Sequence, residues 1–195
     1  MKMNFDVELT WQYGWKHFFG FSDLSNSDDT LFICMVRDPV DWYNSFYKKP
    51  HHLKPENKKD VDAFLHNELH SYNFKQNIEI KEDRNMYTNT PWKNVVELRH
   101  TKLQYLIETL PPLVKHVILI RYEDMLQDFN KVLHRIKDCG LHVKQSIAFP
   151  VNSMKDFGPG QRGNYVKKTH SDITKEMIET HPSFIPTYET QLGYM

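Results

Sequence analysis

The stretch FICMVRDPVDWYNSFY, residues 32–47, decides the fold of this chain. It starts as a continuous apolar run closed by Arg37, a pattern typical of a strand that is covered on both faces of a parallel sheet. Pro39 then stands in the first turn of a predicted helix, with Asp38 as its N-cap. Ser45 follows eight residues after Arg37. A guanidinium and a hydroxyl in these positions predict a phosphate-binding site at the end of the strand.

A second buried strand is predicted at residues 116–122, HVILIRY, and an amphipathic helix follows it. Asp124 is the predicted N-cap of this helix, and Gly140 stands at its end. Its apolar stripe consists of Met125, Leu126, Phe129, Val132, Leu133 and Ile136. Further helices are predicted at residues 60–71, at 94–110 and from about 171 to 180. Two strands that are each followed by a helix indicate an α/β fold with a parallel sheet.

Bulk composition limits the class of protein. The chain has 195 residues, which predicts a single domain, residues 1–195, with a sizeable core. Lys plus Arg and Asp plus Glu number 25 each, so no net charge favours nucleic acid or an anionic membrane. No apolar run approaches the ~20 residues of a membrane span and the N-terminus lacks a signal core, so we expect a cytoplasmic protein. Cys34 and Cys139 are predicted to be reduced.

Polar residues gather where the two predicted strands end. Arg37 closes the first strand, and Arg121, Tyr122 and Glu123 close the second. In open parallel sheets, ligands bind beyond the carboxyl ends of the strands. We therefore expect these two groups of side chains to face one crevice.

These residues resemble the sulfotransferases that use 3′-phosphoadenosine 5′-phosphosulfate as donor. In VRDPVDWYNS, residues 36–45, Arg37 and Ser45 have the spacing of the family's 3′-phosphate motif. RYEDM, residues 121–125, is similar to a family segment whose tyrosine lies near the adenine, which implies that role for Tyr122. The resemblance implies a P-loop-like sulfotransferase fold, a three-layer parallel sheet flanked by helices, that binds the donor as co-substrate.

Two further segments carry the resemblance. GQRGNYVKK, residues 160–168, is similar to the glycine-containing basic loop that closes on the 3′-phosphate in the family. It implies that Arg162 and Gly163 bind the donor, although the family's second glycine and its tryptophan are not in place. The stretch YETQLGY, residues 188–194, also resembles the usual C-terminus of the family.

The catalytic residues are implied by GWKHFFGF, residues 14–21. His17 stands twenty residues before Arg37, where cytosolic members of the family place their general base. Histidine suits this role because its unperturbed pKa of ~6.5 lets it accept an alcohol proton at neutral pH. We hypothesise that Lys16 supplies positive charge to the reaction. The implied acceptor is a carbohydrate or a small alcohol or phenol, and the residues require no metal.

One family element is not found in this sequence, the loop whose amides and lysine hold the 5′-phosphosulfate. Gly14 and Gly20 are the only glycines among the first 139 residues, and neither fits that loop. We therefore expect the sheet to lack its first strand. Three explanations remain open: the chain is a fragment, another segment compensates, or the protein is a non-catalytic nucleotide-binding or scaffold member of the same fold.

Each predicted site residue also has a purely structural interpretation. Arg37 and Asp38 would then form a strand-end ion pair and a helix cap, and Ser45 would be an ordinary exposed serine. His17 would pack among its aromatic neighbours, and Tyr122 would belong to the core. The basic loop would be a solvated surface.

Three other patterns are weaker. HNELH, residues 66–70, places two histidines at i and i+4, but it lacks the glutamate that directly follows the first histidine in zinc proteases. GPGQRG, residues 158–163, matches the dinucleotide-binding glycine pattern without a strand before it. A basic-aromatic surface for RNA is disfavoured by the zero net charge. We therefore expect no metal and no nucleic-acid partner.

Overall fold

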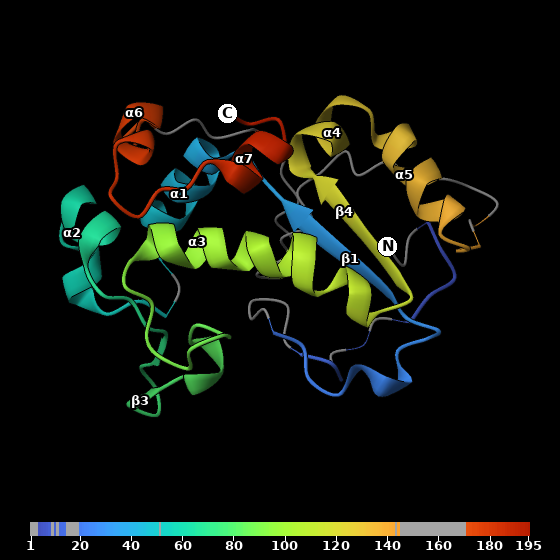
Figure 1. Cartoon of the computed structure of the whole chain (residues 1–195), viewed down its shortest axis with the longest axis horizontal. Coiled ribbons are helices and arrows are strands. Elements are labelled where there is room, and N and C mark those ends of the chain that lie inside the picture. Colours follow the sequence, from blue (N-terminus) through green and yellow to red (C-terminus); the bar gives the residue numbers. More distant parts are fainter. Residues whose placement is uncertain are drawn as a thin grey trace, which may run out of the picture.

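A two-stranded parallel sheet lies at the centre of the described structure (Figure 1). The computed structural model describes residues 4–8, 10, 12–14, 20–50, 52–142, 144 and 171–195. Strand β1 (Leu31–Val36) pairs in parallel with β4 (His116–Arg121), and Val36 is the partner of Arg121, so both strands end at the same level. The prediction of an α/β fold is confirmed as a small parallel sheet of two strands flanked by helices.

Helices and one short hairpin surround this strand pair. The helices are α1 (Pro39–Lys48), α2 (Val61–His66), α3 (Val95–Gln104), α4 (Tyr122–Gln127), α5 (Phe129–Asp138), α6 (Lys175–Glu179) and α7 (Thr187–Gln191). The hairpin consists of β2 (Tyr72–Asn73) and β3 (Ile78–Glu79), which are antiparallel. A π-helical turn, Tyr105–Thr109, continues α3. Short 3₁₀ turns occur at Leu24–Asn26, Pro55–Lys58, Lys81–Asp83 and Pro111–Leu113.

The two strands are covered on both faces. Along each strand, successive side chains point to opposite faces of the sheet. Phe32 and Val36 therefore share one face, where they pack in a cluster with Leu103 of α3. Ile120 points to the other face and packs in a cluster with Leu133 of α5. Cover on both faces fits the continuous apolar runs of the two strands, although Met35 of β1 is 50% exposed.

A second core attaches α1 to the rest of the molecule. Its fully buried members include Tyr43 of α1, Phe64 of α2 and Trp92, which precedes α3. The buried Asn44 side chain donates to the carbonyl of Ile173 at 2.7 Å and accepts from its N–H at 3.0 Å. These contacts fix α1, the helix that begins directly after the predicted phosphate-binding residue.

The helix predicted at residues 60–71 is shorter than expected, because α2 ends at His66. Beyond it, the buried Leu69 exchanges two 2.8 Å backbone hydrogen bonds with Trp92. This tertiary pairing requires an extended chain and therefore ends the helix. His66 and His70 consequently do not share a helical face, which removes the geometry that HNELH suggested.

The helix predicted after the second strand is divided into α4 and α5. The side chain of Asp128 accepts a 2.9 Å hydrogen bond from the N–H of Lys131 and caps α5. The expected cap, Asp124, lies inside α4 instead. Gly140, with φ 91°, follows the end of α5, in agreement with its predicted position. The last predicted helix begins later than expected, after the cap Thr174.

The two cysteines are free thiols. Cys34 is buried on β1, and burial raises its pKa to about 12, so its sulfur stays protonated at neutral pH. Cys139 is half-buried beyond α5. A protonated, buried thiol such as that of Cys34 is a poor nucleophile.

Candidate anion-binding site at the carboxyl edge of the sheet

The register of the sheet brings two predicted site residues together. Because Val36 pairs with Arg121, the next residues, Arg37 and Tyr122, both lie just beyond the paired strands. The Cζ atom of Arg37 lies 5.1 Å from the centroid of the Tyr122 ring, within cation–π range. The carboxyl edge therefore combines a guanidinium and an aromatic ring, two groups suited to a phosphate and a base.

Asp41 is the main charged neighbour of Arg37. Its Oδ2 lies 3.2 Å from Nη2 of Arg37, and their side chains are 17% and 24% exposed. The ion pair thus joins Arg37 to Asp41, whereas the side chain of Asp38 caps α1 by accepting from the N–H of Asp41 at 3.1 Å. Among the described residues, the buried Nε of Arg37 has no hydrogen-bond partner. Because this donor is buried, an incoming anion would reach it only if neighbouring side chains moved, and it would share the rest of the guanidinium with Asp41.

Ser45 lies on α1, one turn beyond Asp41, so these two residues share a face of the helix. Arg37 precedes the N-cap Asp38 and meets this helix through its ion pair with Asp41. Ser45 is exposed, and its hydroxyl makes no hydrogen bond to another described residue. Arg37 is therefore linked to the face of α1 that carries Ser45 only through the carboxylate of Asp41.

The C-terminal segment lies against the same edge of the sheet (Figure 1). The guanidinium of Arg121 stacks on the ring of Tyr194, with 4.6 Å between Cζ and the ring centroid. Glu189 of α7 forms a buried ion pair with Arg99 of α3. No role is predicted for Arg99, Glu189 or Tyr194 from the sequence.

Four predicted site residues lie outside the part of the chain that the structure describes. They are Lys16, His17, Arg162 and Gly163. The basic Lys167 and Lys168 lie outside it as well. The roles of these residues stay predictions.

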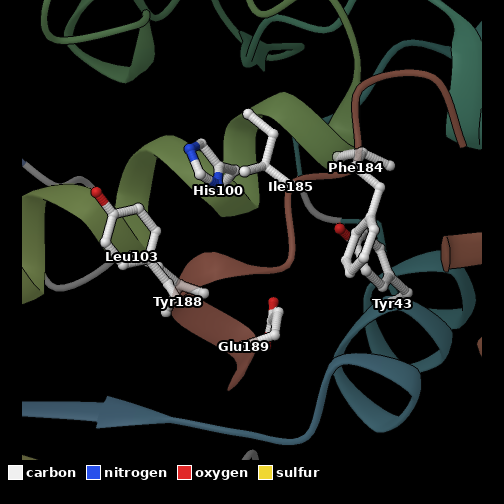
Figure 2. Close-up of a pocket in the computed structure, with 8 residues that line it drawn as sticks. Tyr43, His100, Leu103, Phe184, Ile185, Tyr188 and Glu189 are labelled. Atoms are coloured by element: carbon white, nitrogen blue, oxygen red, sulfur yellow. The ribbon is translucent and has the colours of Figure 1, made fainter. Parts of the chain in front are cut away.

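A small cavity lies between α1, α3 and the C-terminal segment (Figure 2). Its lining consists of Tyr43, Val96, His100, Leu103, Phe184, Ile185, Tyr188 and Glu189. The cavity has a volume of about 10 Å³, enough for about one water molecule. It is far too small for a nucleotide, so the candidate site is the edge of the sheet and not this cavity.

A wider and more open groove of about 740 Å³ follows the β2–β3 hairpin. Its lining consists of His52, Asn73, Gln76, Ile78, Glu79, Ile80, Lys81 and Glu82. None of the site residues that the structure describes contributes to it. The groove therefore adds nothing to the predicted chemistry.

Two histidines make stability depend on pH. Burial is the main cause that lowers the pKa of His181, and the neighbouring His66 lowers it further. The centroids of the two imidazole rings lie 4.5 Å apart. Burial also lowers the pKa of His100, although a hydrogen bond to the Ile185 backbone opposes the shift. Both histidines bind protons more readily in the unfolded chain, so the stability that they contribute is present above pH ~6.5 and is lost as the pH falls below it.

We expect thermal unfolding scans to show a falling melting temperature between pH 7 and pH 5. Linkage limits the contribution of each histidine to about 1.4 kcal/mol per pH unit. The His181→Gln variant should reduce this slope, and the matched variant of the exposed His134, His134→Gln, should not. Equal slopes for both variants and the wild type would contradict the claim that His181 makes stability depend on pH.

The comparisons leave the family open. Within the described ranges, no group of three or more His, Cys, Asp or Glu side chains is placed to hold a metal ion. No helix found in that part of the chain combines the length and the apolar character needed to cross a membrane. No protein-family model, curated protein or solved structure matches the chain.

Proposed function

We propose that this chain is a sulfotransferase-type domain that binds 3′-phosphoadenosine 5′-phosphosulfate at the carboxyl edge of its parallel sheet. The observation that carries the proposal is the stacking of Arg37 on Tyr122, at the ends of two adjacent parallel strands. In the proposed complex, Arg37 and Ser45 hold the 3′-phosphate and Tyr122 lies near the adenine. The proposal includes a three-layer, P-loop-like fold around the two strands.

The proposed reaction moves a sulfuryl group to an acceptor hydroxyl of a carbohydrate, a small alcohol or a phenol. His17 takes the proton of this hydroxyl as its oxygen forms a bond to sulfur. The bond between sulfur and the bridging oxygen breaks in line, which releases 3′-phosphoadenosine 5′-phosphate. Lys16 offsets the negative charge that develops on the bridging oxygen. Arg162 and Gly163 close on the 3′-phosphate.

The guanidinium of Arg37, whose Nε–H has no hydrogen-bond partner among the described residues, is the group that suits a phosphate best. A guanidinium binds phosphate oxygens through several N–H groups at once, and such charge-assisted bonds are stronger than neutral ones. The carboxylate of Asp41 repels the same anion, because it lies 3.2 Å from Nη2 of Arg37. Binding is therefore expected to be tighter when Asp41 turns away from the guanidinium.

A second candidate function is nucleotide binding without catalysis. It is favoured by one feature of the sequence, the lack of a recognisable loop for the 5′-phosphosulfate. The electrostatic stabilisation that such a loop provides is worth a few kcal/mol for each donor in comparable sites, about 10²- to 10³-fold in rate. A domain without it would bind the nucleotide and transfer nothing.

Two assays on the same preparation separate the candidates. Calorimetry with 3′-phosphoadenosine 5′-phosphate measures binding, and transfer of radiolabelled sulfate to a panel of sugars, alcohols and phenols measures catalysis. Binding together with transfer supports the sulfotransferase. Binding without transfer supports the non-catalytic domain, and the loss of both signals refutes the two candidates together.

A further inference from the structure

The peptide group between Arg37 and Asp38 is held on both sides. Its carbonyl, that of Arg37, accepts a 2.8 Å hydrogen bond from Nη2 of Arg99. Its N–H, that of Asp38, donates at 3.0 Å to Oε1 of Glu123. Both partners are charged, which makes these bonds stronger than ordinary backbone bonds. The orientation of this peptide sets where the Arg37 side chain leaves the end of β1.

Both partners of the peptide are in turn held by the C-terminal residues 187–195, which we term the C-terminal clasp. Glu189 of the clasp accepts from Nε of Arg99 at 2.5 Å and from Nη2 at 2.9 Å. Tyr194 of the clasp donates its hydroxyl proton to Oε2 of Glu123 at 2.8 Å. Two separate relays therefore connect the clasp to the two sides of one peptide group.

The local geometry of the clasp lets Tyr194 reach Glu123. Gly193 has φ 72°, a conformation that favours glycine, and the next N–H, that of Tyr194, donates to the carbonyl of Glu189 at 2.9 Å. The turn at Gly193 places the Tyr194 ring against the guanidinium of Arg121. Burial is the main cause that raises the pKa of Tyr194, and the hydrogen bond to Glu123 raises it further. The phenol therefore stays protonated and remains a donor.

Figure 2 shows Glu189, the clasp residue of the other relay, from the side of the cavity. Tyr188 and Glu189 project from α7 into the space between α3 and α1. Arg99 and Glu189 are each about 5% exposed on their side chains. Water therefore does not compete for this pair, and the position of α7 is coupled directly to the carbonyl of Arg37.

We infer that the C-terminal clasp positions Arg37 for anion binding, with Arg99, Glu123, Glu189 and Tyr194 as positioning residues. The consequence for the nucleotide rests on the proposed function, whereas the effect of the clasp on the peptide does not. The clasp thus makes Glu189 and Tyr194 part of the site without contact to the ligand. A loss of either relay frees one side of the peptide group and misplaces the guanidinium.

Tyr194→Phe is the sharpest test of the clasp, because it removes one hydroxyl and keeps the ring on Arg121. Amide hydrogen exchange of the ligand-free protein, followed by NMR, reports on the Asp38 N–H. We expect this amide to exchange at least about 3-fold faster in Tyr194→Phe, since the loss of one hydrogen bond to a carboxylate weakens the hold of Glu123. Tyr188→Phe is the matched control, since it removes a hydroxyl from the same segment outside both relays.

Calorimetry on the same variants measures the consequence for binding. The dissociation constant of 3′-phosphoadenosine 5′-phosphate should rise about 5-fold in Tyr194→Phe and stay unchanged in Tyr188→Phe, with similar melting temperatures for both. Equal exchange of the Asp38 amide in the two variants would overturn the clasp, and so would equal affinities. A wild type that binds no nucleotide would refute the proposed function, and the amide measurement would still decide the clasp.

Discussion

Glu189→Ala is expected to lower the free energy of unfolding by about 3–5 kcal/mol, because it leaves the guanidinium of Arg99 buried without its counter-charge. The two side chains are each about 5% exposed, and two hydrogen bonds join them. For a chain of this length, the loss corresponds to a fall in melting temperature of about 6–20 °C. Urea titration followed by circular dichroism measures it directly.

Two controls separate the loss of the ion pair from the loss of packing. The double variant Arg99→Met with Glu189→Leu removes both charges and keeps side-chain volume, so it should be more stable than Glu189→Ala. Glu179→Gln removes an exposed ion pair with Lys175 and should change stability by less than about 0.5 kcal/mol. If Glu189→Ala were no less stable than Glu179→Gln, the buried pair would not support α7.

Asp83→Ala is expected to cause a loss of similar size, about 3–5 kcal/mol, at a site far along the chain from the clasp. Nζ of Lys102 lies 3.0 Å from Oδ1 of Asp83, and their side chains are 12% and 11% exposed. The hydroxyl of Ser71 donates to the other carboxylate oxygen. Burial lowers the pKa of Lys102, and Asp83 opposes this shift. Without the carboxylate, the lysine would be left buried as a cation or would lose its proton.

Chemical denaturation of Asp83→Ala, of Lys102→Met and of the double variant tests this network. The second substitution removes the buried cation and should recover part of the loss. The single and double variants should therefore differ by more than about 1 kcal/mol. A double variant as unstable as the sum of its two single variants would show that the two groups are not coupled.

The strand pair was predictable because its signal is local. Each strand is an uninterrupted apolar run closed by an arginine, and such runs occur where both faces of a sheet are covered. Arg37 and Tyr122 come together for the same reason, since parallel strands that end at one level bring their next residues together. The helix cap Asp38 was predictable from the proline that follows it.

The helix boundaries depended on contacts that are distant in sequence. Leu69 pairs with Trp92 and ends α2 early, although the local pattern continues to residue 71. Asp128 competes with Asp124 for the role of cap, and both residue types are good caps. Local propensity alone does not decide such cases.

Only one member of the C-terminal clasp relays, Arg99, could be suspected from the local sequence pattern. Arg99 occupies the position between Val95 and Leu103 on the apolar stripe of α3, where a charge has to be paired if it is buried. Its partner Glu189 stands 90 residues later, and no local pattern names it. The stretch YETQLGY alone predicts no contacts, whereas the structure gives its Glu189 and Tyr194 specific partners.

The most direct test of the central claim is the preference for a 3′-phosphate. Calorimetry with 3′-phosphoadenosine 5′-phosphate and with adenosine 5′-phosphate gives this preference as a ratio of two dissociation constants. We predict that the wild type prefers the first ligand by about 10- to 100-fold, that Arg37→Ala abolishes the preference, and that the matched control Arg84→Ala keeps it. An Arg37→Ala variant that retains the wild-type ratio would contradict the claim that Arg37 binds the 3′-phosphate.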